Sequence, residues 1–248
     1  DYPSWYLKNG GEVLSTTINK HIYISCRYLP PFSKHRVIVH YSKIETCNSS
    51  NEIQHPAVRE VLNYRSIEKD LEIHYIGDLP GRGGLGSSSA FTVGLLNAII
   101  AYQGSISSRH QLAMESIHIE QDLIGETVGS QDQVNAAYGG LNHIRFMQNG
   151  EILVRPMTIS QERINRLDNN MMLFYTGIMR TAEKVAESYV EDIQARDKQL
   201  IRMHNMVDEA IEILKNGDLD DFGLLLNESW QLKRSWSKMV SNAQVDEI

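Results

Sequence analysis

The segment PGRGGLGSSSA, from Pro80 to Ala90, contains four glycines and three serines in eleven residues. It follows the strand-like residues 71–76 and precedes an apolar run that reaches Tyr102. Glycines let backbone N–H groups converge without interference from a Cβ, and a helix that starts here has unpaired donors at its positive end. The segment therefore predicts a loop that binds an anion, with phosphate as the favoured ligand.

Three glycines of this loop, Gly81, Gly83 and Gly86, also match the G-x-G-x-x-G pattern of dinucleotide-binding folds. That type of site needs an acidic residue about 20 positions further on, to bind a ribose hydroxyl. The sequence there is SISSRHQ, and the first acid is Glu115, so the pattern does not indicate a dinucleotide site. A nucleoside-triphosphate loop of the Walker type is excluded as well, because no Gly-Lys-Ser/Thr follows the glycines. A serine-capped helix after a glycine turn is the purely structural alternative.

Composition limits the possible classes of protein. The chain has 248 residues, 42% of them apolar, and a formal net charge of −7. The negative charge argues against a nucleic-acid partner, and we find no stretch of about 20 uncharged apolar residues that would cross a bilayer. Two cysteines, Cys26 and Cys47, show neither disulfide-framework nor metal spacing. These features favour a cytoplasmic location with no nucleic acid and no membrane as partner.

Periodicity predicts strands first and helices later, which indicates an α+β fold with a second lobe. The first lobe is expected over residues 1–158 and the second over residues 159–248. The individual elements are expected as follows: strands over 13–28, 35–42, 71–76 and 169–177, helices over 55–66, 90–102, 109–125, 182–217 and 218–239, and a hairpin over 141–157 with its turn at Asn149–Gly150.

The glycine loop resembles the central motif of the GHMP kinases, the family that includes galactokinase, homoserine kinase and mevalonate kinase. Pro80, the triplet Gly84-Leu85-Gly86 and the following serines carry the resemblance. It implies a two-lobed fold, with an N-terminal lobe like ribosomal S5 domain 2 and a ferredoxin-like C-terminal lobe that is truncated here. It also implies ATP and Mg²⁺ as cofactors, with Ser88 as a metal ligand. The residues implied to wrap the ATP phosphates are Gly83, Gly84, Leu85, Gly86, Ser87, Ser88 and Ser89.

Two acidic residues downstream extend the resemblance. Taken alone, Glu120 is most simply a solvated glutamate on a helix, and Asp132 is most simply an aspartate of a turn or cap. Galactokinase-like kinases have a metal-binding glutamate twelve residues before the catalytic aspartate of a Gly-x-x-Asp element. Glu120 and Asp132 have this spacing, and residues 129–132 fit the element. The resemblance thus implies that Glu120 is the second Mg²⁺ ligand and that Asp132 faces the acceptor hydroxyl as the base.

Further segments, among them DYPSWYLKNGGEVLSTTINK at residues 1–20 and FYTGIMRTA at residues 174–182, resemble the heptose 7-phosphate kinases of the same family. The resemblance implies phosphorylation of the anomeric C1 hydroxyl of D-glycero-D-manno-heptose 7-phosphate. It also implies that Asp1 binds sugar hydroxyls. Tyr175, Thr176 and Arg180 are the other candidates for substrate binding, with Arg180 as a cation for the sugar phosphate.

Two other functions remain open. A kinase for a free sugar such as galactose or fucose would use the same machinery, and a non-catalytic sensor of sugar and nucleotide would keep the loop without the base. The expected small-molecule partners are ATP and a sugar phosphate, and a homo-oligomer is compatible with the sequence. The resemblance also predicts family motifs before Asp1 and after Ile248, so we expect the C-terminal lobe to be incomplete in these residues.

Overall fold

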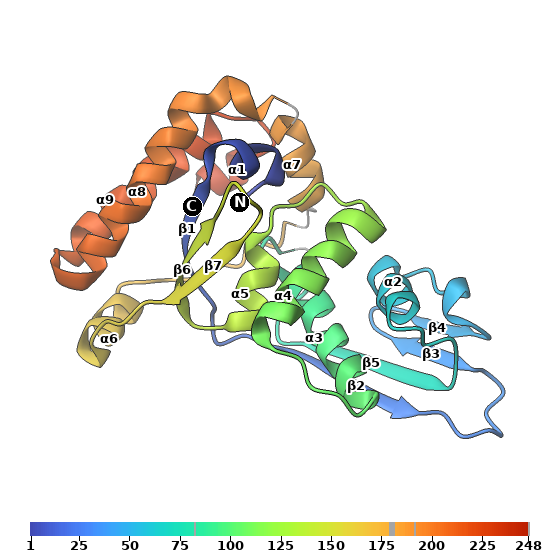
Figure 1. Ribbon diagram of the computed structural model, residues 1–248. Coiled ribbons are helices and arrows are strands. Elements are labelled where there is room, and N and C mark those ends of the chain that lie inside the picture. The colour runs from blue at the N-terminus through green and yellow to red at the C-terminus, as the bar shows by residue number, and fades with distance from the viewer. Residues whose placement is uncertain (82, 179–181, 191, 248) are drawn as a thin grey trace. The chain divides into compact units, whose positions relative to one another are not determined.

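The computed structural model describes residues 1–81, 83–178, 182–190 and 192–247 (Figure 1). The chain divides into two compact units. Unit 1 comprises Asp1–Thr16 and Gly140–Ile248, and unit 2 comprises Thr17–Gly139. These units are not the lobes expected from the sequence, and a lobe boundary near residue 159 stays a prediction. The α+β fold class is confirmed.

Unit 2 contains a four-stranded sheet in the order β2-β5-β3-β4. β5 runs antiparallel to β2 and parallel to β3, and β3 runs antiparallel to β4. Helices cover one face of this sheet (Figure 1). The elements are β2 (Ile22–Tyr28), β3 (Val37–His40), β4 (Ile44–Cys47), a 3₁₀ turn (Ser50–Glu52), α2 (Pro56–Tyr64), β5 (Leu71–Gly77), α3 (Ser87–Tyr102), α4 (Arg109–His118), a π-helical turn (Ile119–Ile124) and α5 (Gln131–Tyr138).

The core of unit 2 follows from alternation along the strands. Val39 of β3 and Ile73 of β5 are fully buried and pack with apolar residues of α2 and α3. Each such side chain stabilises the fold by about 1.5–3 kcal/mol through burial. Because side chains alternate between faces, the neighbours of these residues lie on the face opposite the helices. The expected apolar character of α3 is confirmed, since residues on most of its circumference are buried.

Unit 1 contains an antiparallel sheet in the order β1-β6-β7. The expected hairpin is confirmed, with Gly150 in its turn at a φ of +86°. The elements of this unit are α1 (Pro3–Asn9), β1 (Gly11–Thr16), β6 (Leu141–Phe146), β7 (Ile152–Pro156), α6 (Gln161–Asn169), α7 (Ala182–Val190), a 3₁₀ turn (Ile193–Arg196), α8 (Asp197–Asn216), α9 (Leu219–Arg234) and α10 (Ala243–Asp246).

Two side-chain contacts join elements of unit 1. The Arg163 guanidinium donates to the carbonyls of Ile213 and Leu214 at the C-terminus of α8, at 2.6 and 2.5 Å. A cation suits this position, because the last carbonyls of a helix lack backbone partners and carry partial negative charge. Tyr189 packs edge-on against Trp236, with 5.3 Å between ring centroids, and this pair anchors a second apolar cluster.

Two of the strand predictions are wrong. Residues 13–28 form two strands, β1 and β2, which belong to different sheets. The break falls at residues 17–21, where neither glycine nor proline marks a turn. Residues 169–177 were expected to form a buried strand, but 171–178 adopt no regular structure, and Met172 and Phe174 are exposed by 81% and 60%. An apolar run makes a strand only where a neighbouring backbone supplies hydrogen bonds.

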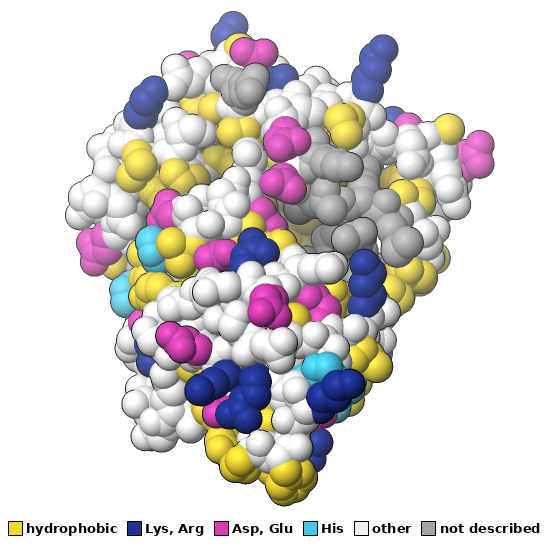
Figure 2. All heavy atoms as spheres, turned by 90° about the vertical axis from the view of Figure 1, so that its right-hand side faces the viewer, with side chains coloured by type: hydrophobic (Ala, Val, Ile, Leu, Met, Phe, Trp, Pro, Cys, Tyr) yellow, Lys and Arg dark blue, Asp and Glu magenta, His cyan; other side chains and the backbone are white. Residues whose placement is uncertain are grey.

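The surface mixes charges of both signs. Figure 2 shows one face, on which Lys and Arg side chains are interspersed with Asp and Glu side chains. Among the described residues, none of the helices is long and apolar enough to cross a membrane.

Candidate active site

The glycine loop ends in a helix start of the kind that binds anions. Gly84 and Gly86 have φ values of +75° and +67°, in the left-handed region that favours glycine. Gly86 is the N-cap of α3, which begins at Ser87, three residues before the expected start at Ala90. The serines thus form the first turn of the helix, where backbone N–H groups have no partner within the helix. This arrangement can bind a phosphate group through backbone donors.

Asp132 lies directly against this loop. A Cβ placed on Gly86 would be 3.2 Å from Asp132 Oδ2 and 3.3 Å from Asp132 Cγ. α5 begins at Gln131, and Asp132 occupies its first turn. The start of α5 therefore brings a carboxylate to the start of α3, within the same compact unit.

Glu120 is buried between the helices of unit 2. Its residue is 1% exposed and belongs to the π-helical turn that continues α4, a type of turn found frequently at functional sites. Oε2 accepts hydrogen bonds from Ser89 Oγ at 2.8 Å and from Gln133 Nε2 at 2.5 Å. Oε1 has no hydrogen-bond partner among the described residues. One oxygen of the carboxylate is thus held by two neutral donors, and the other is a buried oxygen without such a donor.

The surroundings of Glu120 disfavour its charged form. Burial is the main cause that raises the pKa of this carboxyl, and the negative charge of Asp132 acts in the same direction. Thr92, Ser89 and Gln133 favour the charged form but do not outweigh burial. An ionised carboxylate in such a place costs free energy until a cation compensates it.

The residues present fit Mg²⁺, which prefers oxygen ligands and uses only one or two protein side chains in phosphate-binding sites. The unpaired Oε1 of Glu120 supplies a carboxylate oxygen. Ser88 supplies an exposed hydroxyl in the first turn of α3. The serine that contacts Glu120 directly is Ser89, not Ser88. The metal-binding roles of Ser88 and Glu120 remain predictions.

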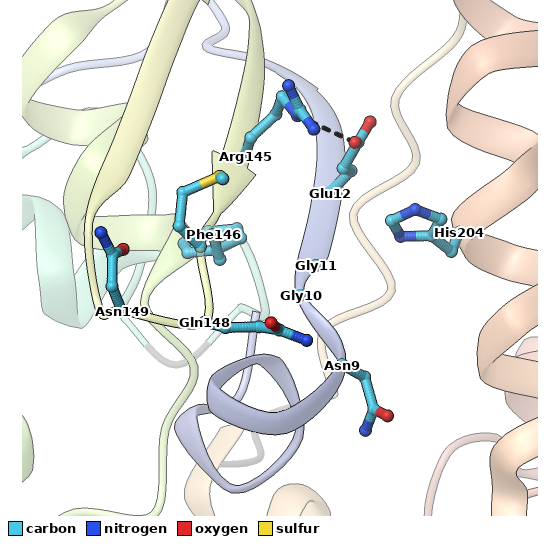
Figure 3. A pocket seen from close by; sticks show the side chains of 10 residues that line it. Asn9, Gly10, Gly11, Glu12, Arg145, Phe146, Gln148, Asn149 and His204 are labelled. Carbon is cyan, nitrogen blue, oxygen red and sulfur yellow. Dashed lines mark hydrogen bonds and ion pairs between the residues drawn. The ribbon is translucent and has the colours of Figure 1, made fainter.

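A cavity of about 400 Å³ lies in unit 1, whereas Ser88, Glu120 and Asp132 belong to unit 2. Figure 3 shows Glu12 of β1 and Arg145 of β6 on one side of it and His204 of α8 on the other. Arg145 Nε donates to Glu12 Oε1 at 3.0 Å, and His143 Nε2 lies 2.8 Å from Glu12 Oε2. None of the expected site residues lines this cavity.

Comparison with known proteins identifies the segment that carries the loop, Glu120 and Asp132. Residues 51–140 match the family model described as the GHMP kinases N terminal domain. These residues are therefore similar to the N-terminal domain of the GHMP kinases. The resemblance inferred from the glycine loop is confirmed.

Relatives of this GHMP kinase domain are sugar kinases. The chain is 30% identical over 195 residues to the D-glycero-alpha-D-manno-heptose 7-phosphate kinase of Campylobacter jejuni, an alignment that covers 75% of this chain and 57% of that protein. It is 24% identical over 255 residues to the galactokinase of Thermotoga maritima, covering 91% of this chain and 72% of that protein. The chain therefore spans little more than half of the Campylobacter relative.

Solved structures support the fold of the GHMP kinase domain and the residues around it. The crystal structure of a D-glycero-D-manno-heptose 1-phosphate kinase from Bacteroides thetaiotaomicron matches with a TM-score of 0.73. The match covers 93% of this chain and 73% of that chain, at 23% sequence identity. At this identity the likeness shows the fold alone.

The remaining predicted residues lie outside the GHMP kinase domain. Asp1, Tyr175 and Thr176 belong to unit 1, and Tyr175 is 58% exposed. The Thr176 hydroxyl accepts a hydrogen bond from the backbone N–H of Ile178 at 3.3 Å. Arg180 lies outside the described residues. The roles of these four residues in substrate binding remain predictions.

One residue that contacts Glu120, Gln133, was not predicted from the sequence. Gln133 is fully buried and donates to Glu120, but a glutamine next to a candidate aspartate carries no motif of its own. Gln133 follows Asp132 in the first turn of α5, so only its closeness to Asp132 could have been expected from the sequence. Its contact with Glu120 could not be inferred, because it depends on how α5 packs near the π-helical turn.

Proposed function

We propose that this chain is the larger part of an ATP-dependent sugar kinase that phosphorylates the anomeric C1 hydroxyl of D-glycero-D-manno-heptose 7-phosphate. One observation carries the proposal: the Asp132 carboxylate lies against Gly86, the last glycine of the phosphate-binding loop. A carboxylate beside a phosphate site is otherwise unfavourable, since it repels the ligand. Its presence there is explained if it contacts the hydroxyl that receives the phosphoryl group.

The residues take distinct parts in this reaction. Backbone N–H groups at Gly84–Ser88 bind the phosphates of ATP. Asp132 orients the sugar hydroxyl and accepts its proton, while the hydroxyl oxygen forms a bond to the γ-phosphorus and the bond from that phosphorus to the ADP oxygen breaks. Most of the rate enhancement comes from positioning and from neutralising charge, because such transfer needs little covalent help from the protein.

Glu120 and Ser88 would hold Mg²⁺, which neutralises the negative charge of the ATP phosphates when it is bound. Ser89 and Gln133 fix the orientation of the Glu120 carboxylate through Oε2 and leave Oε1 for the ion. The protein thus supplies a pre-oriented ligand before ATP arrives.

The choice of sugar rests on the relatives. The Campylobacter relative is named a heptose 7-phosphate kinase and the Bacteroides structure a heptose 1-phosphate kinase, so both names concern heptose but different phosphates. The first name gives the 7-phosphate as the substrate of that relative, and the C1 hydroxyl is the acceptor that we propose from the family resemblance. The alignment with a galactokinase favours a free sugar as the second candidate. A cytoplasmic location is part of the same proposal.

A substitution at Asp132 tests whether the chain is a kinase at all. In the full-length protein, Asp132→Asn should lower turnover by about 100-fold or more, because the asparagine accepts no proton. The affinity for ATP, measured with a fluorescent ATP analogue, should stay within about 2-fold. Asp122→Asn is the matched control, since Asp122 is an exposed aspartate paired with His118 on the π-helical turn. Unchanged turnover in Asp132→Asn would disprove the role of Asp132.

A substrate panel tests the sugar. ADP release by the full-length protein should be fastest with D-glycero-D-manno-heptose 7-phosphate and slower with galactose, fucose and mannose. Faster release with a free sugar would replace the heptose by that sugar. ATP binding with no ADP release from any of these sugars would favour a non-catalytic sensor.

A further inference from the structure

A second group of ionisable side chains lies on the face of the unit 2 sheet opposite the helices. Glu72 and His74 are two residues apart on β5 and therefore point to the same face. β3 runs parallel to β5 with His40 opposite His74. These three side chains come from adjacent strands, which Figure 1 shows side by side, and none of them belongs to the candidate active site.

The ligand atoms of the three residues converge. His74 Nε2 lies 2.8 Å from Glu72 Oε1, and His40 Nε2 lies 3.2 Å from the same oxygen. The two imidazole rings stack with centroids 4.1 Å apart and an angle of 6° between their planes. All three ligand atoms lie within 4.8 Å of one another. The side chains of His40 and His74 remain partly open to solvent, since they are 31% and 39% exposed.

Hydrogen bonds within the cluster leave one of its polar atoms without a partner among the described residues. His74 Nε2 and Glu72 Oε1 form a hydrogen bond, whereas the buried His40 Nε2 has no hydrogen-bond partner among the described residues. A buried polar atom without a hydrogen-bond partner destabilises the fold. This nitrogen points into the cluster, because it is only 3.2 Å from the shared carboxylate oxygen.

Arg27 fixes the carboxylate from the other side. Its Nε and a terminal nitrogen lie 2.7 and 2.5 Å from Glu72 Oε2. The pairing follows from the strands, since Arg27 of β2 lies opposite Glu72 in the antiparallel register. Oε2 is thus occupied, and Oε1 faces the two imidazoles. Outer groups that hydrogen-bond a carboxylate in this way orient it as a metal ligand.

We propose that His40, Glu72 and His74 form a binding site for a divalent transition-metal ion that prefers imidazole ligands, with Zn²⁺ as the best fit. Two imidazole nitrogens and one carboxylate oxygen are a ligand set for Zn²⁺ that leaves a position for water. Imidazole-rich sites favour Zn²⁺, Cu²⁺ and Ni²⁺ over Mg²⁺. The ion therefore differs in class from the one expected at Glu120.

Small side-chain rotations suffice to receive the ion. Tetrahedral Zn²⁺ with bonds of about 2.0–2.1 Å to each nitrogen places the two nitrogens about 3.3 Å apart. The rings have to tilt out of their stack, and their exposed edges leave room for this movement. The ion would then link β3 to β5 on the face that the helices do not cover. Such a link stabilises the sheet by mass action whenever the free ion exceeds its dissociation constant.

Titration of the full chain with Zn²⁺ in the presence of excess Mg²⁺ tests the proposal, because Mg²⁺ occupies sites made of oxygen ligands alone. We expect one Zn²⁺ per chain, a rise in melting temperature on binding, and affinity at least about 10-fold weaker in His40→Ala and in His74→Ala. Co²⁺ in place of Zn²⁺ should give visible bands of a tetrahedral ion without thiolate charge transfer, since neither Cys26 nor Cys47 belongs to the cluster.

His110→Ala is the matched control, because His110 is an exposed histidine on α4 outside the cluster. It should bind Zn²⁺ like the wild type. Circular dichroism of each variant without metal separates lost binding from lost fold, and both histidines lie on a solvent-facing sheet surface where alanine is tolerated. Equal Zn²⁺ affinity in the wild type and both cluster variants, or no binding by the folded wild type, would overturn the proposal.

Discussion

Glu120 and Glu72 are two nearly buried carboxylates of unit 2, 1% and 5% exposed, and their surroundings act in opposite ways. Burial disfavours the charged form of both. At Glu120 the hydrogen-bond donors are the neutral side chains of Ser89 and Gln133, and burial prevails, so the pKa is raised. At Glu72 burial is outweighed by Arg27 and His74, which donate hydrogen bonds and add positive charge, so the pKa is lowered.

The difference separates a buried carboxylate that has only neutral donors from one that has a cationic partner in the protein itself. Neutral donors orient Glu120 without neutralising it, which suits a ligand for an ion that arrives with ATP. Arg27 neutralises Glu72 in the protein alone and still leaves one oxygen directed at two imidazoles. Each of the following substitutions alters one side of this contrast.

The largest effect is expected from Glu120→Gln. Turnover of the full-length protein should fall by at least about 100-fold, because the proposed metal ligand loses its charge. Stability should rise at neutral pH in a metal-free buffer. The raised pKa means that wild-type Glu120 is protonated at low pH and carries a costly charge only above its pKa. The advantage of the variant should therefore grow as pH rises, measured by urea unfolding between pH 4 and 8. An advantage that stays constant across this range would contradict the raised pKa.

The substitution Gln133→Met should have the second largest effect. It removes a donor to a buried carboxylate and should cost about 2 kcal/mol of unfolding free energy at neutral pH. Gln111→Met is the matched control, because Gln111 donates to Glu115 Oε1 at 2.7 Å on an exposed helix surface. That variant should lose less than about 0.5 kcal/mol. Similar losses in the two variants would show that burial does not determine how much the hydrogen bond from Gln133 to Glu120 contributes to the free energy of unfolding.

Glu72→Gln is expected to have the smallest effect, with a loss of about 1 kcal/mol at neutral pH, since Arg27 is 70% exposed and its charge is screened by solvent. A lowered pKa stabilises the fold above the usual carboxyl range, and that stability disappears as pH falls through the folded-state value. The loss should therefore vanish in acid, as should the gain from Glu120→Gln, and the two effects have opposite signs at neutral pH. Thermal unfolding across the same pH range checks it, and a loss that persists in acid would point to packing instead of charge.

Much of the local structure could be predicted from the sequence. The Asn149–Gly150 turn and the buried helix after the glycine loop follow from residue types at fixed offsets. The division of residues 13–28 between two sheets could not be predicted. Both strands have the composition of one long strand, and the choice of partner is made by β6 and β5, which lie far away in the chain.

The candidate site shows the same limit. The loop and the spacing of Glu120 and Asp132 could be found in the sequence, because they depend on glycine conformation and on a family pattern. The partners of Glu120 could not, since they are set by how α3 and α5 pack beside the π-helical turn. The cluster around Glu72 was missed because its members become neighbours only through the parallel pairing of β3 with β5.

The position of unit 2 within the chain has a consequence for the order of folding. β1 ends at Thr16, and its partner in the sheet at that point is Leu141 of β6, so all of unit 2 lies between the two paired strands. Unit 2 is one continuous segment and can complete its core once Gly139 has left the ribosome. β1 must wait for β6 and must close a loop as long as the whole of unit 2. The glycine loop, Glu120 and Asp132 therefore belong to the part of the molecule that can form first.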